Sequence, residues 1–346
     1  MAETLTDREK EILKYVVENF IKSASPVGSR SISKQSDLNL SSATIRNVMS
    51  DLEERDLLNT PHTSAGRIPT DKGYRYYVDI LMEMENLNTK EENKLKNLFD
   101  ERNLSILETR DLYIETSRIL GKITNLLSVV TQPMISGGVF DKLELVSVAS
   151  NKIMVVLNIK AGIIKTVMME IDTEISKYKL ENLSLFLNER LYGLTLSQIR
   201  ESLVERVSDY KLQEPELIQL FINSMDKLYT DEEKGNKIYI GGTGDLIIQP
   251  EFGNPKNFKD IINLAEDKNL VIHIFQNTVH NDNEVMISIG KENSEQKLKN
   301  YSVVTTSYKV GDVKGNIGVI GPKRMNYARM ISLLQYTSKL INEISN

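Results

Sequence analysis

The amino-acid sequence predicts an α+β multidomain protein that begins with a winged helix-turn-helix domain. In the first 60 residues, three short segments carry apolar residues at helical spacing, and turn residues separate them. A short ribbon with a small-residue turn follows the third segment directly. The rest of the chain alternates between strand-like and helix-like stretches. Because 346 residues are too many for one small core, we expect two or three domains.

The first expected helix begins at a capping box. In the tetrapeptide TDRE, from Thr6 to Glu9, the Thr6 hydroxyl can accept the Glu9 N–H while the Glu9 carboxylate reaches back. Pro26 and Gly28 later interrupt the chain and end this segment. Between these signals the apolar residues form one stripe at helical spacing: Ile12, Leu13, Val16, Val17 and Phe20.

The second and third expected helices follow closely. A short helix over 29–36 would turn Ile32 inward and leave Arg30 and Lys34 exposed. Ser41 is a good N-cap for the third helix. The apolar residues of that helix recur at i, i+3, i+4 and i+7, which predicts one buried stripe: Ile45, Val48, Met49 and Leu52.

The opposite face of the third helix is small and polar. Arg and Asn side chains make the bidentate contacts that recognise guanine and adenine in the major groove, while Ser and Thr suit phosphates and thymine methyl groups. The N–H groups at the helix start, near Ser41, favour phosphate. An ordinary amphipathic surface helix would show the same pattern, so this segment alone leaves both interpretations open. The face consists of Ser42, Thr44, Arg46, Asn47 and Ser50.

A turn-rich tip over residues 61–66 connects the two short strands of the ribbon. A tip with almost no apolar bulk does not pack into a core, so we expect it to contact a partner. We expect Arg67 to enter a minor groove or hold a phosphate, and His62 and Thr63 to lie at the flanking backbone. Helix, turn, helix and wing in this order predict a DNA-binding domain over residues 1–82.

Net charge does not favour DNA binding. Residues 1–80 hold eleven Lys and Arg against twelve Asp and Glu, within a chain of net charge −5. From residue 25 to 50, however, the sequence holds three cations and a single carboxylate: Arg30, Lys34, Arg46 and Asp37. Attraction to DNA would therefore be local, and affinity would depend on a dimer.

Composition argues against most other functions. The absence of Cys excludes disulfides, thiolate metal sites and cysteine nucleophiles, and three His leave little for metal or acid–base chemistry. The glycine-rich segment 241–244 lacks the Gly-Lys-Ser/Thr of a phosphate loop, so we expect a turn. His273 and His280 are too far apart for a local metal pair, although Asp282 and Glu284 keep a weak metal interpretation open. We expect no enzyme, cofactor or metal.

No run of eighteen apolar residues and no basic-apolar signal peptide occurs in the sequence. We therefore expect a cytoplasmic protein without a membrane segment.

Beyond the first domain, apolar runs and helical spacing predict the remaining elements. Helices are expected near 91–102, 106–127, 176–230 and 325–344. Strands are expected over Ser128–Thr131, Leu143–Ala149, Ile153–Ile159, Ile163–Ile171, Lys237–Ile240, Asp245–Ile248, Leu270–Phe275, Glu284–Ile289, Tyr301–Tyr308 and Gly315–Ile320.

Four stretches closely resemble the HrcA family of bacterial heat-shock repressors. The third is long and unusual and is therefore specific, and the fourth resembles the C-terminal signature of the family. The resemblance spans most of the chain, and the middle is its least distinctive part. The stretches are PVGSRSIS (26–33), SSATIRNVMSDLE (41–53), PHTSAGRIPTDKGYRYYVD (61–79) and IGVIGPKRMNYARMISLLQY (317–336).

The resemblance implies a winged helix, a GAF-like α/β sensor domain and a dimerisation domain inserted into that sensor domain. The alternation of strands, helices and strands is consistent with this organisation. We therefore divide the chain into a winged helix-turn-helix domain (1–82), a linker helix (83–103), a first GAF-like part (104–175), an inserted dimerisation domain (176–267) and a second GAF-like part (268–346).

The resemblance also implies a function, that of a homodimeric repressor of chaperone genes. Its operator would be the inverted repeat called CIRCE, and the GroE chaperonin would keep the repressor active. In this hypothesis Arg46 and Asn47 contact bases, Arg30 and Lys34 hold phosphates, and two-fold protein symmetry matches the operator. Residue spacing alone does not indicate the chaperonin.

Two alternatives remain. The GAF-like portion could be a small-molecule sensor in a winged-helix repressor that controls a metabolic operon. An enzyme with a fused regulatory domain has little support, because no catalytic constellation is present in the sequence.

Overall fold

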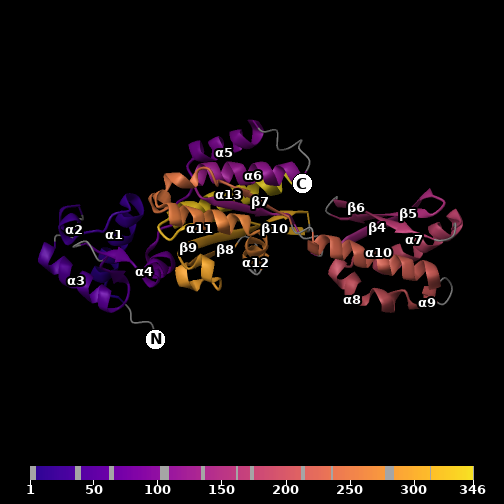
Figure 1. Ribbon diagram of the computed structural model, residues 1–346, viewed down its shortest axis with the longest axis horizontal. Helices are drawn as coiled ribbons and strands as arrows, with labels where there is room; N and C mark the ends of the chain where they lie inside the picture. Colours follow the sequence, from indigo (N-terminus) through magenta and orange to yellow (C-terminus); the bar gives the residue numbers. More distant parts are fainter. Residues whose placement is uncertain are drawn as a thin grey trace. The chain divides into compact units, whose positions relative to one another are not determined.

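The computed structural model describes residues 5–35, 40–61, 66–101, 109–133, 137–160, 163–171, 175–211, 215–234, 237–276, 284–311 and 313–345 (Figure 1). The chain forms two compact units. The first comprises Met1–Val130, Tyr239–Thr306 and Ile317–Thr337, and the second comprises Thr131–Ile238, Ser307–Asn316 and Ser338–Asn346.

The N-terminal part of the first unit has the helices and ribbon that the sequence predicts. The capping box is present, because the Thr6 hydroxyl accepts the Glu9 N–H at 3.4 Å and the Thr6 N–H donates to Glu9 at 2.7 Å. The elements are α1 (Asp7–Ser23), α2 (Ser29–Gln35), α3 (Ser42–Glu54), β1 (Leu58–Asn59), β2 (Ile68–Pro69), α4 (Asp71–Tyr76) and the π-helical turn η1 (Tyr77–Leu81). The prediction of a winged helix-turn-helix fold is confirmed for this part of the chain.

The two predicted apolar stripes form the core of this domain. On α1 the stripe is buried except for Phe20, which is half-buried, and on α3 all four predicted residues are buried. Helix α4 closes the domain through Gly73, where an added Cβ would lie 2.0 Å from the carbonyl oxygen of Leu57. Only glycine permits this approach of α4 to the ribbon.

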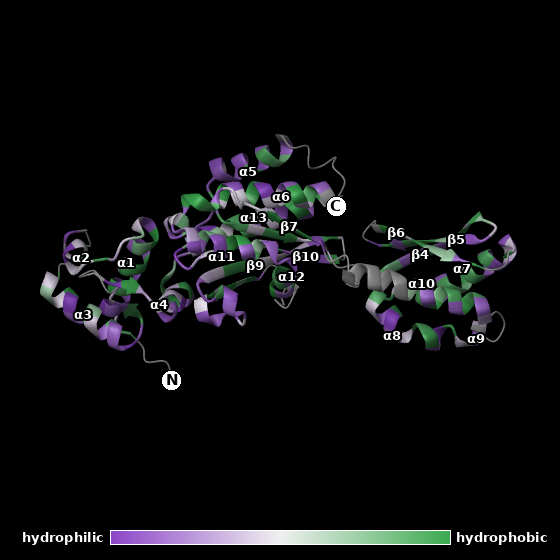
Figure 2. Ribbon diagram, viewed as in Figure 1, coloured by the Kyte–Doolittle hydropathy of each residue, from purple (hydrophilic) through white to green (hydrophobic). Residues whose placement is uncertain are grey.

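The central part of the first unit contains most of a five-stranded sheet with the strand order β7-β3-β10-β9-β8, in which the end of β9 and the start of β10, within Ser307–Asn316, belong to the second unit. Strand β10 pairs antiparallel with β3, and β8 pairs antiparallel with β9. In Figure 2, both hydrophobic (green) and hydrophilic (purple) residues appear along the strands and helices of this part. The strands are β3 (Leu127–Thr131), β7 (Ile238–Gly241), β8 (Val285–Ile289), β9 (Tyr301–Val310) and β10 (Val313–Pro322). The helices are α5 (Thr89–Glu101), α6 (Thr109–Thr124), α11 (Pro255–Glu266), α12 (Lys268–Gln276) and α13 (Tyr327–Ser345).

The glycine-rich segment after β7 is a turn packed tightly against α6. A Cβ on Gly241 would lie 2.2 Å from the Ser117 carbonyl oxygen, and one on Gly242 would lie 2.0 Å from the Leu126 carbonyl oxygen. Gly242 also has a φ of +82°. Close approach of the backbone to α6 and Leu126 therefore accounts for these glycines, in agreement with the prediction of a turn.

Two strand predictions in this part were wrong. Residues 245–248 contain the 3-10 turn η4 (Leu246–Ile248), and Leu270–Phe275 lies inside helix α12. A six-residue apolar run fits a buried helix as well as a strand. The helical start is set by Asp267, whose carboxylate accepts the Leu270 N–H at 3.2 Å.

The second unit contains a three-stranded antiparallel sheet covered on one face by helices. The sheet consists of β4 (Phe140–Ala149), β5 (Lys152–Ile159) and β6 (Ile163–Glu170). The helices are α7 (Lys177–Leu191), α8 (Leu196–Arg206), α9 (Ser208–Lys211) and α10 (Pro215–Lys234). The strand residues that alternate inward, such as Ile153, Val155 and Leu157, share one hydrophobic core with Leu183, Phe221 and other helix residues.

This shared core differs from our division of the middle of the chain. We expected the strands before residue 176 to belong to the first GAF-like part, but they pack with the helices of the expected insertion. Conversely, β7 from Tyr239 onward and α11 belong to the first unit, although we expected them before the boundary at 267. We therefore propose that the insertion begins before β4 and ends near Ile238.

Within the part of the chain that the structure describes, no helix is both long and apolar enough to span a membrane.

Candidate nucleic-acid interface

Helices α2 and α3 form the helix-turn-helix, and hydroxyl groups hold its geometry. The Ser29 and Ser42 hydroxyls are 3.1 Å apart, which joins the two helix starts, and the Ser33 hydroxyl donates to the Leu40 carbonyl at 3.0 Å. At the start of α3, the Ser41 hydroxyl accepts the Thr44 N–H at 3.1 Å and contacts the Thr44 hydroxyl at 2.9 Å. Ser41, Ser42 and Thr44, which we predicted as supporting DNA contacts, thus also fix the helix within the domain.

The outer face of α3 consists of Ala43, Arg46, Asn47 and Ser50, all of which are exposed. These four residues recur at helical spacing opposite the buried stripe. Among the residues that the structure describes, neither Arg46 nor Asn47 has an ion-pair or hydrogen-bond partner. Sequence inspection for polar residues missed Ala43, which its spacing of three positions before Arg46 could have revealed. Its methyl group suits contact with a thymine methyl.

Two acidic residues limit how much of α3 can approach a polyanion. Asp51 and Glu54 are exposed in the C-terminal half of the helix. Like charge would repel these carboxylates from phosphates. The N-terminal half therefore offers the favourable surface, which is the part of a recognition helix that contacts base edges in helix-turn-helix proteins.

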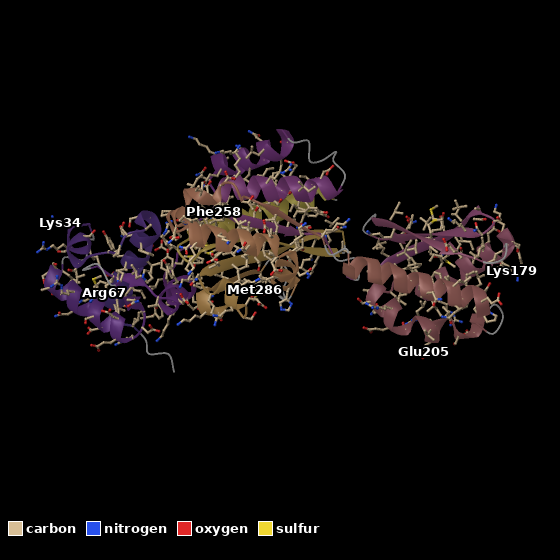
Figure 3. All side chains as sticks on the ribbon, viewed as in Figure 1. Lys34, Arg67, Lys179, Glu205, Phe258 and Met286 are labelled. Atoms are coloured by element: carbon tan, nitrogen blue, oxygen red, sulfur yellow. The ribbon has the colours of Figure 1, made fainter. Side chains whose placement is uncertain are left out.

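Helix α2 adds positive charge beside this surface. Arg30 and Lys34 are both exposed, as the sequence predicts, and Figure 3 shows Lys34 projecting outward from α2. Exposed Lys and Arg side chains near a recognition helix are suited to phosphate contacts.

The ribbon places Arg67 beside α3. Strands β1 and β2 pair antiparallel, and Val27 and Arg67 exchange two backbone hydrogen bonds of 2.9 Å. The Arg67 side chain is only 19% exposed, and its Nε lies 2.9 Å from an Oε of Glu53 near the end of α3. In this structure the Arg67 side chain pairs with Glu53 and so joins the base of the wing to α3, and contact between Arg67 and DNA stays a prediction. His62 and Thr63 lie outside the described residues.

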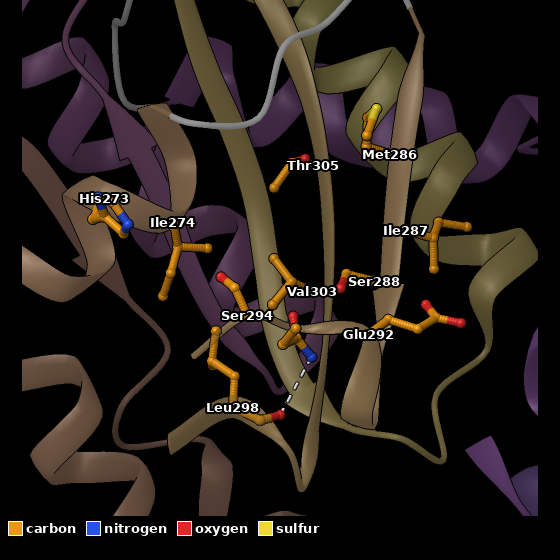
Figure 4. Close-up of a pocket in the computed structure, with 11 residues that line it drawn as sticks. His273, Ile274, Met286, Ile287, Ser288, Glu292, Ser294, Leu298, Val303 and Thr305 are labelled. Carbon is orange, nitrogen blue, oxygen red and sulfur yellow. Dashed lines mark hydrogen bonds between the residues drawn. The ribbon is translucent and has the colours of Figure 1, made fainter. Parts of the chain in front are cut away.

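A cavity of about 250 Å³ lies in the central part of the first unit, between α12 and the strands β8 and β9 (Figure 4). Its walls combine apolar and polar side chains, among them His273, Met286, Ser288, Glu292, Val303 and Thr305. Asn293 also lines the cavity; it is buried, and its side-chain amide donates to the backbone carbonyls of Gly290, Leu298 and Tyr301. The volume is below the roughly 300–1,000 Å³ typical of small-molecule sites.

Among the described residues, no group of three or more His, Asp or Glu side chains is placed to hold a metal ion. His280 and Asp282, which kept a weak metal interpretation open, lie outside the described residues.

Comparison with known proteins gives a consistent family match over nearly the whole chain. Residues 4–85 match the family model described as winged helix-turn-helix transcription repressor, HrcA DNA-binding, and residues 110–331 match the HrcA protein C terminal domain. A heat-inducible transcription repressor HrcA from Chlorobium phaeobacteroides (strain BS1) is 39% identical over 342 residues, which cover 97% of each protein. The repressor of the same name from Chlorobaculum tepidum is 40% identical over 98% of this chain and 97% of that protein.

A crystal structure of a protein described only as hypothetical shares the fold, with a TM-score of 0.56 and 19% identity over 99% of this chain and 98% of that chain. The similar sequences are named transcription repressors and not enzymes. The winged helix-turn-helix geometry, the exposed outer face of α3 and these matches agree: the chain belongs to the HrcA family of heat-inducible transcription repressors.

Proposed function

We propose that this protein represses chaperone genes by binding, as a homodimer, the CIRCE inverted-repeat operator. The observation that carries the DNA-binding part is the outer face of α3. There Arg46 and Asn47 stand exposed, without a partner among the described residues, on the N-terminal half of a capped helix. Such side chains cost little to bring to DNA, because they give up no internal interaction.

In the proposed complex each α3 lies in the major groove over one half of the repeat. Arg46 pairs with a guanine and Asn47 with an adenine, since these side chains match the donor and acceptor patterns of those bases. Ser50 and Ala43 fill the surface between them. Arg30 and Lys34 of α2 hold the flanking phosphates, which fixes register without adding sequence preference.

The exposed face of the sheet β4–β5–β6 supports the homodimer. Val146, Met154 and Met168 lie in one cross-strand row, because Met154 pairs with both neighbours in the antiparallel register. On the same face Val148 is 56% exposed and Ile164 is 64% exposed. A half-covered sheet with apolar side chains on its open face is typical of an interaction surface. We propose that a second copy of the chain covers it through a two-fold contact.

We predict that Met154→Asp combined with Met168→Asp places charges on this face and separates the dimer. Sedimentation equilibrium of the full chain measures the association. The matched control is Lys165→Asp on the same strand β6. A double variant that stays dimeric would exclude this surface.

The role of the chaperonin rests on family resemblance alone. In the proposal the GroE chaperonin keeps the repressor in its binding-competent form. When unfolded proteins occupy the chaperonin, that support is withdrawn and transcription of the chaperone genes begins.

A DNA-binding experiment tests the operator. The probes are a duplex with the inverted repeat from upstream of a chaperone operon, a duplex with one half-site, and a scrambled duplex of equal length. We expect the full repeat to bind at least tenfold more tightly than the half-site. Equal affinity for all three duplexes would refute the proposed specificity.

Addition of purified chaperonin should raise the fraction of repressor that binds the full repeat, and no change would refute the chaperonin step.

The cavity between α12, β8 and β9 favours one alternative function, a repressor with a small-molecule sensor. Its mixed lining offers hydroxyl groups beside apolar walls, as small-molecule sites do. A thermal-shift screen of metabolites against the full chain separates the two hypotheses. A compound that raises the melting temperature and changes operator affinity would support the sensor, and Thr305→Leu, which fills the cavity, should abolish its effect.

A further inference from the structure

Two sequence motifs that lie far apart in the chain meet in the first unit. The segment TDKGYR, which begins at Thr70 and forms α4, contacts the segment GPKRMNY, which ends at Tyr327 at the start of α13. Both belong to stretches that carry the family resemblance, yet neither contributes to the outer face of α3. The outer face of α3 therefore does not explain the contact between these two segments.

Asp71 anchors the first side of this contact. Its carboxylate accepts a hydrogen bond from Lys323 Nζ at 2.5 Å and another from the Lys291 backbone N–H at 3.0 Å. The carboxylate presses against Gly290, where an added Cβ would lie 2.2 Å from an Oδ of Asp71. Gly290 has a φ of +56°, so both its conformation and the space around it require glycine.

Arg75 forms the second side, one helical turn further along α4. Its Nε and Nη2 donate to the two carboxylate oxygens of Glu292 at 2.8 and 2.5 Å, and Nη2 also donates to the Ile287 carbonyl at 2.6 Å. The bond to Glu292 raises the pKa of Arg75. Glu292 is itself fixed, because it accepts the Ile289 N–H at 2.8 Å. A bidentate pair of this kind fixes the orientation of the two side chains as well as the distance between them.

A buried aromatic contact lies between the two charged pairs. Tyr74 of α4 is 2% exposed, and its ring centroid is 6.1 Å from that of Tyr327, which is fully buried. The Tyr327 hydroxyl donates to the Lys323 carbonyl at 2.6 Å. Arg324, next to Lys323, donates to the Ile21 carbonyl of α1 and pairs with Glu251 at 2.6 Å. The segment that ends at Tyr327 thus contacts both α1 and α4 of the DNA-binding domain.

We propose that four residues, Asp71, Arg75, Lys323 and Glu292, position the DNA-binding domain on the central part of the first unit, called the central domain below. We call these residues the α4 clamp, and by holding this position they set operator affinity. The extended segment 82–88 that follows the π-helical turn would by itself leave the domain free to rotate. A dimer contacts both half-sites only if each α3 is held in a suitable orientation, and any freedom of that orientation must be given up on binding. This inference rests on the proposed dimeric binding of an inverted repeat.

The composition of the clamp suits a contact that can open and close. Its ion pairs are partly exposed, with the Arg75 and Glu292 side chains 29% and 35% accessible. Each such pair contributes little to the free energy of the contact, and the network contributes more than its single pairs. All of the pairs can therefore break together without unfolding either domain.

A measurement without DNA tests the positioning directly. The chain has no cysteine, so Lys22→Cys on α1 and Lys259→Cys on α11, both exposed, allow specific labelling with a fluorophore pair. We expect single-molecule energy transfer to give a narrow distribution for the labelled chain with the clamp intact. Arg75→Ala should broaden it, and Arg75→Glu combined with Glu292→Arg should restore it. An unchanged distribution in Arg75→Ala would overturn the proposal.

A second measurement links the clamp to function through the ratio of the affinity for the inverted repeat to that for one half-site. In Arg75→Ala we expect this ratio to fall at least tenfold while half-site affinity changes less than twofold. Arg118→Ala, which removes an exposed i, i+3 pair on α6 with Glu115, is the matched control and should leave the ratio unchanged. Glu292→Gln provides a milder variant if Arg75→Ala does not fold, and should lower the ratio by a smaller factor.

The outcomes separate this inference from the proposed function. If the unmodified chain shows no preference for the inverted repeat, the proposed function fails, and the energy-transfer experiment alone decides whether the clamp positions the domain. If the preference is present and Arg75→Ala keeps the full ratio, the proposed function stands and the clamp is refuted.

Discussion

On the outer face of α3, Arg46 is exposed and has no partner among the described residues, whereas on α4 the guanidinium of Arg75 donates to Glu292, Asp79 and a backbone carbonyl. Both residues belong to the same small domain, and both lie in stretches that resemble the family. The difference teaches that a cation must be judged by its surroundings and not by its motif. A cation without a partner is available to DNA, and a cation held in several directions maintains the structure.

The largest effect should come from the buried stripe beneath the outer face. Ile45 is fully buried on α3, so Ile45→Ala should lower the free energy of unfolding of this domain by about 2–5 kcal/mol. The outer face loses its support and operator binding falls with it. Thermal unfolding of the full chain, together with a binding titration, checks this. Ser50→Ala on the opposite face is the control for stability, and it should change the free energy of unfolding by no more than about 0.5 kcal/mol.

The next largest effect should come from Arg46, which tests the outer face itself. Arg46→Ala should cost about 1–3 kcal/mol of operator binding and relax base preference at one position in each half-site. Unfolding should be unaffected, because the side chain has no described partner. Titrations against operators with single base changes measure both effects. Unchanged preference at every position would remove Arg46 from the base contacts.

A smaller effect is expected for Lys34, which distinguishes phosphate contact from base contact. Lys34→Ala should weaken binding to operator and scrambled DNA alike. It should also reduce the slope of log affinity against log salt by about 0.9 for each phosphate that is no longer neutralised. Binding titrations over a salt series provide the measurement. If Lys34→Ala and Arg46→Ala behave identically in that series, the division between phosphate and base contacts is incorrect.

The smallest effect should come from Arg67, and it tests whether this arginine holds the wing or contacts DNA. Because its side chain pairs with Glu53 at the base of the wing, Arg67→Ala should cost at most about 1 kcal/mol of stability and leave the salt slope of DNA binding unchanged. Glu53→Gln should reproduce the stability change. A reduced salt slope in Arg67→Ala alone would instead place this arginine on DNA.

Much of the winged helix could be predicted because its signals are local. The capping box joins Thr6 to Glu9, and the Ser41 cap joins a hydroxyl to an N–H three positions later. The buried stripe of α3 follows from helical spacing alone. Where a local signal was ambiguous, as in the apolar run Leu270–Phe275, the prediction of a strand failed, and only the cap at Asp267 favoured the observed helix.

The grouping of strands could not be predicted in the same way. The apolar runs at 143–149 and 153–159 indicated strands correctly, yet no local signal states which helices cover a sheet. The structure packs these strands against α7 and α10 and leaves their other face exposed. A choice of this kind depends on burial summed over many distant residues.

By itself the sequence determined the fold of the DNA-binding domain, the polar outer face of α3 and the family, because caps, helical spacing and long motifs are properties of neighbouring residues. Only the tertiary structure decided that Arg67 faces Glu53, that β4–β6 share a core with α7, α8 and α10, and that Arg75 meets Glu292 from 217 positions away. An ion pair forms wherever folding brings opposite charges within a few ångströms. The partner of a charged residue is therefore fixed by the packing of whole domains and not by the residues beside it.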